Sequence, residues 1–224
     1  MKALIFDFDG LIIDTEMPDY VSWQEVYRDH GVELPLELWA SILGGNASSD
    51  FDPYDHLEEL VGKSVDREAI WIKRRKRDID LIAIQPILPG VEEYFQDAKR
   101  LGLQLAIASS SPESWVIGHL TRLNLINNFD CICTADDVIK TKPDPSILLE
   151  VLSGLKVSAD ECIMFEDSPN GVLAANRAGI FCVCVPNELT ARLDLEHADL
   201  KLNSLAEISL ENLLQKAAAL KGAN

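Results

Sequence analysis

The spacing of apolar residues changes twice along this chain, and the changes outline its organisation. The first residues include the apolar run Leu4-Ile5-Phe6, which has the length and composition of a buried β-strand. From residue 16 to 84 the apolar residues recur at helical spacing. This segment is therefore predicted to contain helices and no strand, with two of its helices near 53–61 and 66–83.

Predicted strands and helices alternate from Pro89-Gly90 onward. The apolar runs expected to form strands are 103–108, 129–134, 162–165 and 181–185, and the segments expected to form helices are 91–101, 112–123, 145–155, 171–178 and 205–220. This alternation is typical of right-handed crossovers, which give a parallel sheet with helices on both faces. We therefore predict an α/β fold. An open parallel-sheet, Rossmann-like core (residues 1–15 and 85–224) carries an inserted all-helical cap domain (residues 16–84).

The composition and charge exclude several classes of partner. Of the 224 residues 47% are hydrophobic and 25% are charged, which is enough apolar material for a sizeable buried core. The 20 Lys and Arg residues against 37 Asp and Glu residues give a formal net charge of -17, which opposes binding to nucleic acid or to an anionic membrane. An anionic substrate would therefore need local positive charge at its site.

The five cysteines indicate a reducing environment and no metal site of their own. Cys131/Cys133 and Cys182/Cys184 form two C-x-C pairs in predicted strands, where both members share a face and are expected to be small buried apolar residues. The odd number of cysteines, with no secretory leader and no apolar run of transmembrane length, leads us to expect a cytoplasmic protein. We also expect a monomer.

Two carboxylates follow the first predicted strand, in the sequence Phe6-Asp7-Phe8-Asp9-Gly10. Alternate side chains of a strand share a face, so Asp7 and Asp9 can approach one site from the same side. Charges at the tip of a buried strand need a binding partner, and a Mg²⁺ ion with an electrophilic phosphorus would provide one. An ordinary Asp-Gly turn is the alternative interpretation.

Three more predicted strands are followed by polar groups, at the sheet edge where open parallel sheets bind ligands. Ser109 follows one strand and would suit a phosphate oxygen, although Ser shortly before Pro is also an ordinary helix cap. Lys142 precedes a helix expected to begin with Asp144 as its N-cap, an unfavourable place for a cation unless an anion or carboxylates lie near it. Glu166-Asp167 ends another strand and is the expected second half of a Mg²⁺ site.

Together these groups resemble the four motifs of the haloacid dehalogenase-like hydrolase superfamily. In order along the chain they are Asp7-Phe8-Asp9-Gly10, Ser109, Lys142-Pro143-Asp144-Pro145 and Glu166-Asp167-Ser168-Pro169-Asn170-Gly171. The helical insertion after the first motif is similar to the cap of the subgroup that contains β-phosphoglucomutase and small sugar-phosphate phosphatases. The dehalogenases of the superfamily lack the second Asp, so we set dehalogenation aside.

The resemblance implies a Mg²⁺-dependent phosphomonoesterase that acts on a small phosphorylated metabolite, such as a sugar phosphate. Asp7 would attack phosphorus and form an aspartyl-phosphate, and Asp9 would act as the general acid and then the general base. Ser109, Ser110 and Lys142 would bind the phosphate oxygens. The Mg²⁺ ligands would be Asp7, the backbone carbonyl of Asp9, Asp167 and, partly through water, Glu166.

Departures from the mutase pattern favour hydrolysis over a phosphomutase, which is the alternative. Asp19 stands where β-phosphoglucomutases carry a cap histidine, and the cap loop 44–52 has no Lys or Arg to grip a second phosphate. A phospho-accepting signalling domain would place its metal pair and its acceptor on separate strands and would lack the insertion. A catalytically silent binding protein would not be expected to retain all the motif residues.

Several other cap and core residues are expected to have structural roles. Most of the basic run 73–77 should be solvated, with one or two members able to face the cleft. Asp14 is expected to form hydrogen bonds at the cap hinge. The tryptophans are expected to pack in the core; they are Trp23, Trp39, Trp71 and Trp115.

Overall fold

A six-stranded parallel sheet is the centre of the computed structural model, which describes residues 1–43 and 51–222. The strand order is β3-β2-β1-β4-β5-β6, and all neighbours pair in parallel. The strands are β1 (Ala3–Phe6), β2 (Gln104–Ala108), β3 (Cys131–Cys133), β4 (Cys162–Glu166), β5 (Phe181–Cys184) and β6 (Leu200–Lys201). The predicted α/β fold is confirmed. Strand β6 was not predicted, because two residues are too few to form a recognisable pattern.

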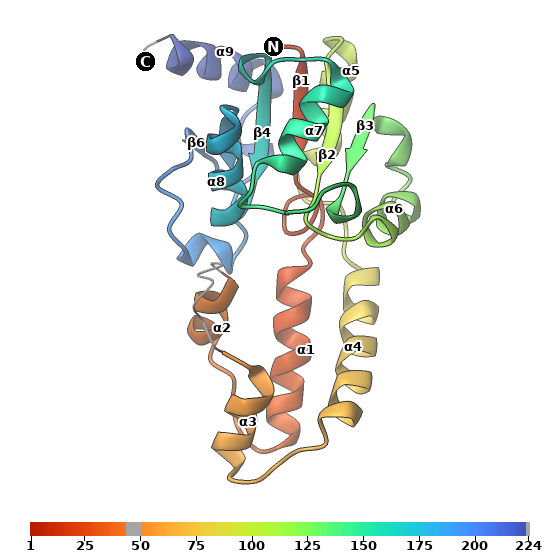
Figure 1. The fold of residues 1–224 in the computed structure, drawn as a ribbon, viewed down its shortest axis with the longest axis vertical. Coiled ribbons are helices and arrows are strands. Elements are labelled where there is room, and N and C mark those ends of the chain that lie inside the picture. The colour runs from red at the N-terminus through yellow and green to blue at the C-terminus, as the bar shows by residue number, and fades with distance from the viewer. Residues whose placement is uncertain (44–50, 223–224) are drawn as a thin grey trace.

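Helices cover both faces of this sheet because alternate strand residues point to opposite sides. Leu4 and Phe6 of β1 pack in the layer formed by α5 (Val91–Arg100), α6 (Glu113–Arg122) and α9 (Leu210–Lys221). Ala3 and Ile5 pack against α7 (Ser146–Leu155) and α8 (Pro169–Ala178), which lie in front of the sheet in Figure 1. All five cysteines are free thiols, and all of them, from β3, β4 and β5, pack in this second layer.

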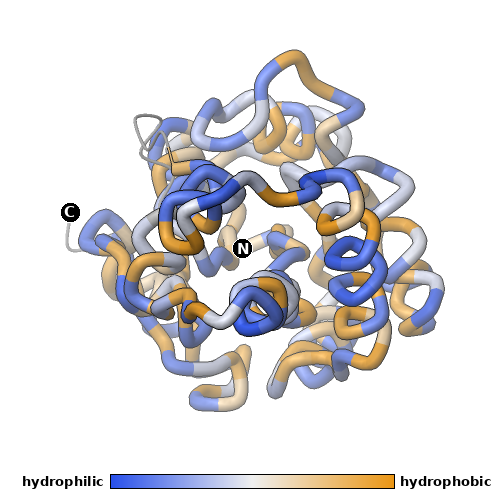
Figure 2. The backbone as a smooth tube through the Cα atoms, turned by 90° about the horizontal axis from the view of Figure 1, so that it is seen from below, coloured by the Kyte–Doolittle hydropathy of each residue, from blue (hydrophilic) through white to orange (hydrophobic). Residues whose placement is uncertain are grey.

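Among the described residues, four helices form a separate layer beyond the carboxyl ends of the strands (Figure 1). They are α1 (Glu16–Asp29), α2 (Leu36–Leu43), α3 (Pro53–Val61) and α4 (Arg67–Ala83). A cluster of buried aromatic and aliphatic side chains, including Trp23, Tyr27 and Leu57, holds them together, and Leu189 from the segment after β5 joins it. Blue and orange positions are interleaved along the helices in Figure 2, as expected for helices that bury one face only.

The helices α7 and α9 begin at different residues from those predicted, and in both cases a polar side chain binds a backbone N–H group at the start of the helix. Helix α7 begins at Ser146, whose backbone N–H donates to the Asp144 carboxylate at 3.0 Å, so the cap lies one residue beyond the predicted one. The predicted helix 205–220 is two elements, a 3-10 turn at Leu205–Glu207 and α9 from Leu210. The side chain of Ser209 caps α9 and separates the two. No helix within residues 1–43 and 51–222 has both the length and the apolar composition that crossing a lipid bilayer requires.

Candidate active site

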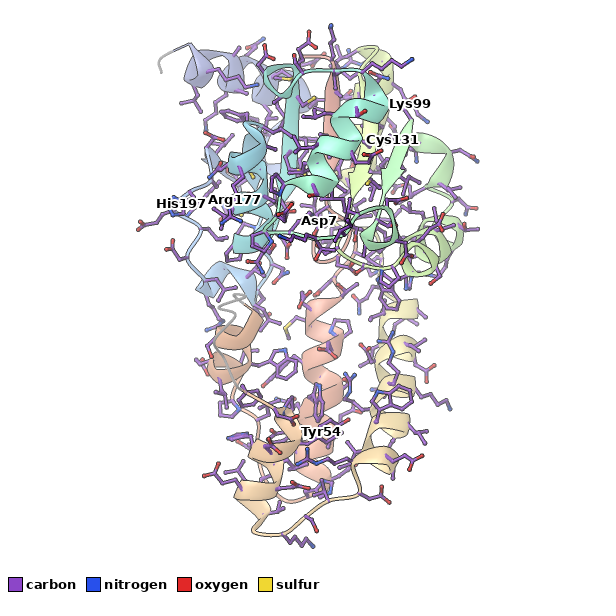
Figure 3. The ribbon with its side chains drawn as sticks, viewed as in Figure 1. Asp7, Tyr54, Lys99, Cys131, Arg177 and His197 are labelled. Carbon is purple, nitrogen blue, oxygen red and sulfur yellow. The ribbon has the colours of Figure 1, made fainter. Side chains whose placement is uncertain are left out.

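The candidate site lies where the chain connections of the sheet diverge. Strands β1 and β4 are neighbours, but the chain continues from β1 to β2 on one side and from β4 to β5 on the other. Ligands of open α/β sheets bind at such a switch point, beyond the carboxyl ends of the strands. Asp7 follows β1 directly and lies between the sheet and the helical layer in Figure 3.

Three buried carboxylates meet at this point. Asp7, Glu166 and Asp167 each offer a carboxylate oxygen, and these oxygens lie within 4.8 Å of one another. Glu166 is the last residue of β4, and the parallel pairing of Phe6 with Phe165 brings the two strand ends side by side. The structure therefore brings together the two acidic strand ends that the sequence analysis proposed as halves of one site.

Lys142 is the only cation in contact with these carboxylates within the described chain. Its Nζ donates a hydrogen bond to Asp7 Oδ1 at 2.8 Å and another to Glu166 Oε1, and its side chain is only 5% exposed. Burial lowers the pKa of Lys142, but the charges of Asp7 and Glu166 outweigh this effect and raise the pKa above its usual value. The sequence analysis required an anion or carboxylates near Lys142, because a cation is unfavourable before the start of a helix. Asp7 and Glu166 are these carboxylates.

One ammonium does not balance the three carboxylates. Burial raises the pKa of Asp7 although Lys142 opposes the shift, and burial raises the pKa of Glu166 to about 7. The pKa of Asp167 lies well above its usual range because of burial and the charges of Asp7 and Glu166. A divalent cation would neutralise this excess negative charge, and carboxylate oxygens are the ligands that Mg²⁺ prefers. The donor set therefore fits a divalent metal ion.

Two glycines allow the carboxylates to come this close. Gly10 has a φ of +73°, and a Cβ atom at this position would overlap the carboxylate of Asp167. Gly171 lies in the first turn of α8, where a Cβ atom would overlap the carboxylate of Glu166. The Asp-Gly pair after β1 is thus a turn and also a part of the site.

Both carboxylate oxygens of Asp9 are bound by core residues. Ser111 Oγ donates to Oδ2 at 2.6 Å, and Trp115 Nε1 donates to Oδ1 at 2.9 Å. The side chain of Asp9 is not in the cluster formed by Asp7, Glu166 and Asp167, and a metal contact through its backbone carbonyl stays a prediction.

The prediction that the tryptophans pack in the core is confirmed for Trp23 and Trp39, holds in part for Trp115, and is wrong for Trp71. Trp23 and Trp39 are each 6% exposed, whereas Trp71 is 56% exposed on α4. Trp115 packs against the core with part of its ring only and lines the cavity with the rest. Periodicity along a helix could not separate these cases, because it does not show whether a helix face meets the core, the cavity or solvent.

Ser109 and Ser110 both line the cavity but differ in burial. Ser109 follows β2, is 1% exposed, and accepts a hydrogen bond on Oγ from the backbone N–H of Ser111 at 3.1 Å. It therefore closes a turn and does not cap α6, which begins at Glu113 after Pro112. Ser110 is exposed at the mouth of the cavity.

The cavity has a volume of about 730 Å³ and lies between the sheet edge and the helices α1 and α4. Asp7, Lys142 and Asp167 line its core side. Its helical side carries Glu16 and Asp19 of α1 together with Arg75 and Asp78 of α4.

Helix α1 brings two acidic side chains to the cavity. Burial, together with the charges of Asp9 and Asp19, raises the pKa of Glu16 to about 8. Asp14 fixes the start of this helix by accepting hydrogen bonds from the backbone N–H groups of Glu16 and Met17, as predicted.

Four members of the basic run 73–77 do not line the cavity. Lys73 binds Asp29 at 2.5 Å and Arg77 binds Glu25 at 2.9 Å, both on α1. Arg75 is the one member that lines the cavity. The loop 44–52, whose lack of Lys and Arg was used to argue against a second phosphate site, lies largely outside the described residues, which omit 44–50.

Asn187 is a site residue that the sequence analysis missed. Its Nδ2 donates to Asp167 Oδ2 at 2.8 Å, and its own Oδ1 accepts from the backbone N–H groups of Leu189 and Thr190. Its position in the sequence could have identified it, because Asn187 follows the predicted strand 181–185 as other site residues follow their strands. Ser111 also follows a predicted strand, 103–108, whereas Trp115 lies in a predicted helix and gave no such signal.

Comparisons with known proteins agree with this geometry. A family model described as haloacid dehalogenase-like hydrolase matches residues 4–185. "Putative phosphatase YhcW" of Bacillus subtilis (strain 168) is 46% identical over 214 residues, which are 96% of this chain and 96% of the relative. Hexitol phosphatase B of Escherichia coli (strain K12) is 32% identical over 217 residues, 95% of this chain and 96% of the relative. The crystal structure of β-phosphoglucomutase from Clostridium difficile has a TM-score of 0.71 at 28% identity and covers 98% of each chain.

Proposed function

This chain belongs to the haloacid dehalogenase-like hydrolase family and is a phosphatase, and we propose that it hydrolyses a small phosphorylated metabolite through an aspartyl-phosphate on Asp7, with Mg²⁺ as its cofactor. The expectation drawn from the four motifs is confirmed for the family. The observation that carries the proposal is the meeting of Asp7, Asp167 and Lys142 at the ends of two adjacent strands.

Asp7 is the proposed nucleophile because it binds Lys142 and also lines the cavity. Glu166, the other carboxylate that Lys142 contacts, is fully buried and does not line the cavity. An oxygen of its carboxylate forms a bond to phosphorus while the bond between phosphorus and the ester oxygen breaks. A carboxylate can approach an anionic phosphate only if positive charge offsets their repulsion, and Lys142 supplies part of it. When bound by Asp7, Asp167 and Glu166, Mg²⁺ would supply the rest.

Asp9 is the proposed general acid and base. In the first step it gives a proton to the leaving alkoxide. In the second step it removes a proton from the water that attacks phosphorus, while the bond between phosphorus and the Asp7 oxygen breaks and inorganic phosphate leaves. The hydrogen bonds from Ser111 and Trp115 hold the Asp9 carboxylate in a defined orientation. Ser109, Ser110 and Lys142 are the proposed ligands of the phosphate oxygens, since all three line the cavity beside Asp7.

We further propose that residues 16–84 form a cap domain over a core of residues 1–15 and 85–224. The helices α1 and α4 form one wall of the cavity, while segments that follow the core strands supply the opposite wall. In this arrangement the core carries the chemistry, and the cap contacts the part of the substrate that leaves with the alcohol.

Release of inorganic phosphate from a panel of phosphorylated metabolites, measured with Mg²⁺ and with a chelator, tests the proposal. We expect Mg²⁺-dependent release that Asp7→Asn abolishes while the protein stays folded. Asp80→Asn is the matched control, because Asp80 is exposed on α4 and does not line the cavity. Full activity of Asp7→Asn would refute the assignment of the nucleophile.

A phosphomutase is the second candidate, because the match to a β-phosphoglucomutase structure extends over nearly the whole chain. A mutase must hold a second phosphate group on its intermediate. The one cavity-lining cation on the helical side within the described residues, Arg75, is already paired with Asp78 at 2.6 Å. Formation of a positional isomer with no release of phosphate would favour the mutase.

A further inference from the structure

The helical wall of the cavity contains a buried carboxylate with one free oxygen. Asp78 of α4 is 2% exposed and lines the cavity. Its Oδ2 accepts a hydrogen bond from Arg75 at 2.6 Å, while its Oδ1 has no hydrogen-bond partner among the described residues. A buried acceptor without a partner is costly, so its presence beside a ligand cavity points to a partner that arrives with the ligand.

The chemistry of this oxygen limits the ligand group that it can bind. An ionised carboxylate only accepts hydrogen bonds, so the ligand group must donate one. Arg75 is paired with Asp78 and lies over the ring of Trp115, 5.3 Å from its centroid. Because the Arg75 charge already balances that of Asp78, a neutral donor such as a hydroxyl group fits better than an ammonium group.

The second arginine of this region does not change the charge of the wall. Arg74 binds Asp19 and donates to Ser22 Oγ at 3.1 Å, and it lies over the ring of Trp23. Both arginines are therefore paired with carboxylates, and Glu16 adds a further acidic group. A second phosphate or a carboxylate on the substrate would meet no unpaired cation among the described residues of this wall.

We infer that Asp78 determines substrate specificity by accepting a hydrogen bond from a hydroxyl group of the leaving alcohol, and that its pairing with Arg75 disfavours substrates with a distal anion. This inference rests on the proposed phosphatase function. It assigns the substrate class of the same site as a polyhydroxylated monophosphate with an uncharged distal end.

Three substrates separate the hydroxyl and charge effects. Sorbitol 6-phosphate carries hydroxyl groups along its chain, and hexyl phosphate has the same chain length without them. The third, 6-phosphogluconate, replaces the distal hydroxymethyl group of sorbitol 6-phosphate with a carboxylate. The wild-type protein is expected to have a higher kcat/KM for sorbitol 6-phosphate than for either of the others.

Two variants of Asp78 test the two roles. Asp78→Ala removes the acceptor and is expected to lower the ratio of kcat/KM for sorbitol 6-phosphate over hexyl phosphate by about 10- to 100-fold. It also frees Arg75, so the ratio for 6-phosphogluconate over sorbitol 6-phosphate should rise by about 10-fold. Asp78→Asn keeps an acceptor but not the charge, and should keep more of the hydroxyl preference while gaining the same tolerance of the carboxylate. Asp80→Asn, the exposed control, should change neither ratio.

A purely structural role of Asp78 would lower kcat/KM for all three substrates together and leave both ratios unchanged, which would overturn the inference. If Asp78→Ala does not fold, equal kcat/KM values of the wild type for sorbitol 6-phosphate and hexyl phosphate would overturn it as well. Failure of the proposed function is distinguishable, because the wild type would then release no phosphate from any of these substrates or from p-nitrophenyl phosphate.

Discussion

Replacing Lys142 by Met should destabilise the metal-free protein strongly. The Lys142 side chain is 5% exposed, and its two partners, Asp7 and Glu166, have side chains that are 11% and 0% exposed. Met has a similar length and no charge, so the variant keeps the packing and leaves the two carboxylates without their cation. Breaking a buried ion pair in this way costs about 3–5 kcal/mol, because the remaining charges stay desolvated.

The expected effect is large enough to measure by thermal unfolding. For a chain of this size, 1 kcal/mol changes Tm by roughly 2–4 °C, so Tm should fall by about 6–20 °C in the presence of a chelator. Adding Mg²⁺ should recover part of the loss, because a dication bound by the same carboxylates replaces the missing charge. The loss should also shrink below about pH 7, where Glu166 takes up a proton.

Lys140→Met provides the control for this experiment. Lys140 is exposed on the same segment of chain, so its replacement should leave Tm unchanged with and without Mg²⁺. If Lys142→Met unfolds at the wild-type temperature in chelator, the three carboxylates do not depend on the ammonium, and the electrostatic account of the site is wrong.

Three further predictions follow from contacts around the site. Trp115→Phe keeps an aromatic ring beneath Arg75 but removes the hydrogen bond to Asp9. It should lower kcat for alkyl phosphates by about 5- to 10-fold in steady-state assays. The effect on aryl phosphates should be smaller, because their leaving groups need little protonation. The metal-free wild type should lose stability in urea titrations as pH rises from 4.5 to about 7, because folded Glu166 keeps a proton that the unfolded chain has released; a constant stability over this range would contradict the shift. Gly171→Ala should reduce stability by about 1–3 kcal/mol in the same titrations, because its methyl group displaces the Glu166 carboxylate.

The sequence was sufficient for the sheet and for the main acidic cluster. Apolar runs of strand length, alternating with helical periodicity, predicted five of the strands, and polar residues after those runs indicated Asp7, Lys142 and Glu166-Asp167. Local patterns succeed here because the carboxyl ends of parallel strands must meet at one edge of the sheet.

The helical wall could not be predicted in the same way. Arg75 and Asp78 lie on a helix on which most of the charged residues form ion pairs. Only the packing of α4 against α1 decides which of them face the cavity. The hydrogen bond from Trp115 to Asp9 joins residues 106 positions apart and depends on tertiary structure alone. Specificity determinants are therefore less visible in the sequence than the groups that perform the chemistry.

The identity of the phosphorylated side chain tests the central claim most directly. Asp9→Asn should slow hydrolysis of the intermediate and allow the phospho-enzyme to accumulate during turnover. Quenching with borohydride reduces an acyl phosphate to an alcohol, and peptide mass spectrometry then locates the modified residue. Our account predicts homoserine at position 7. Phosphate or its reduction product on any other residue, with Asp7 unmodified, would contradict it.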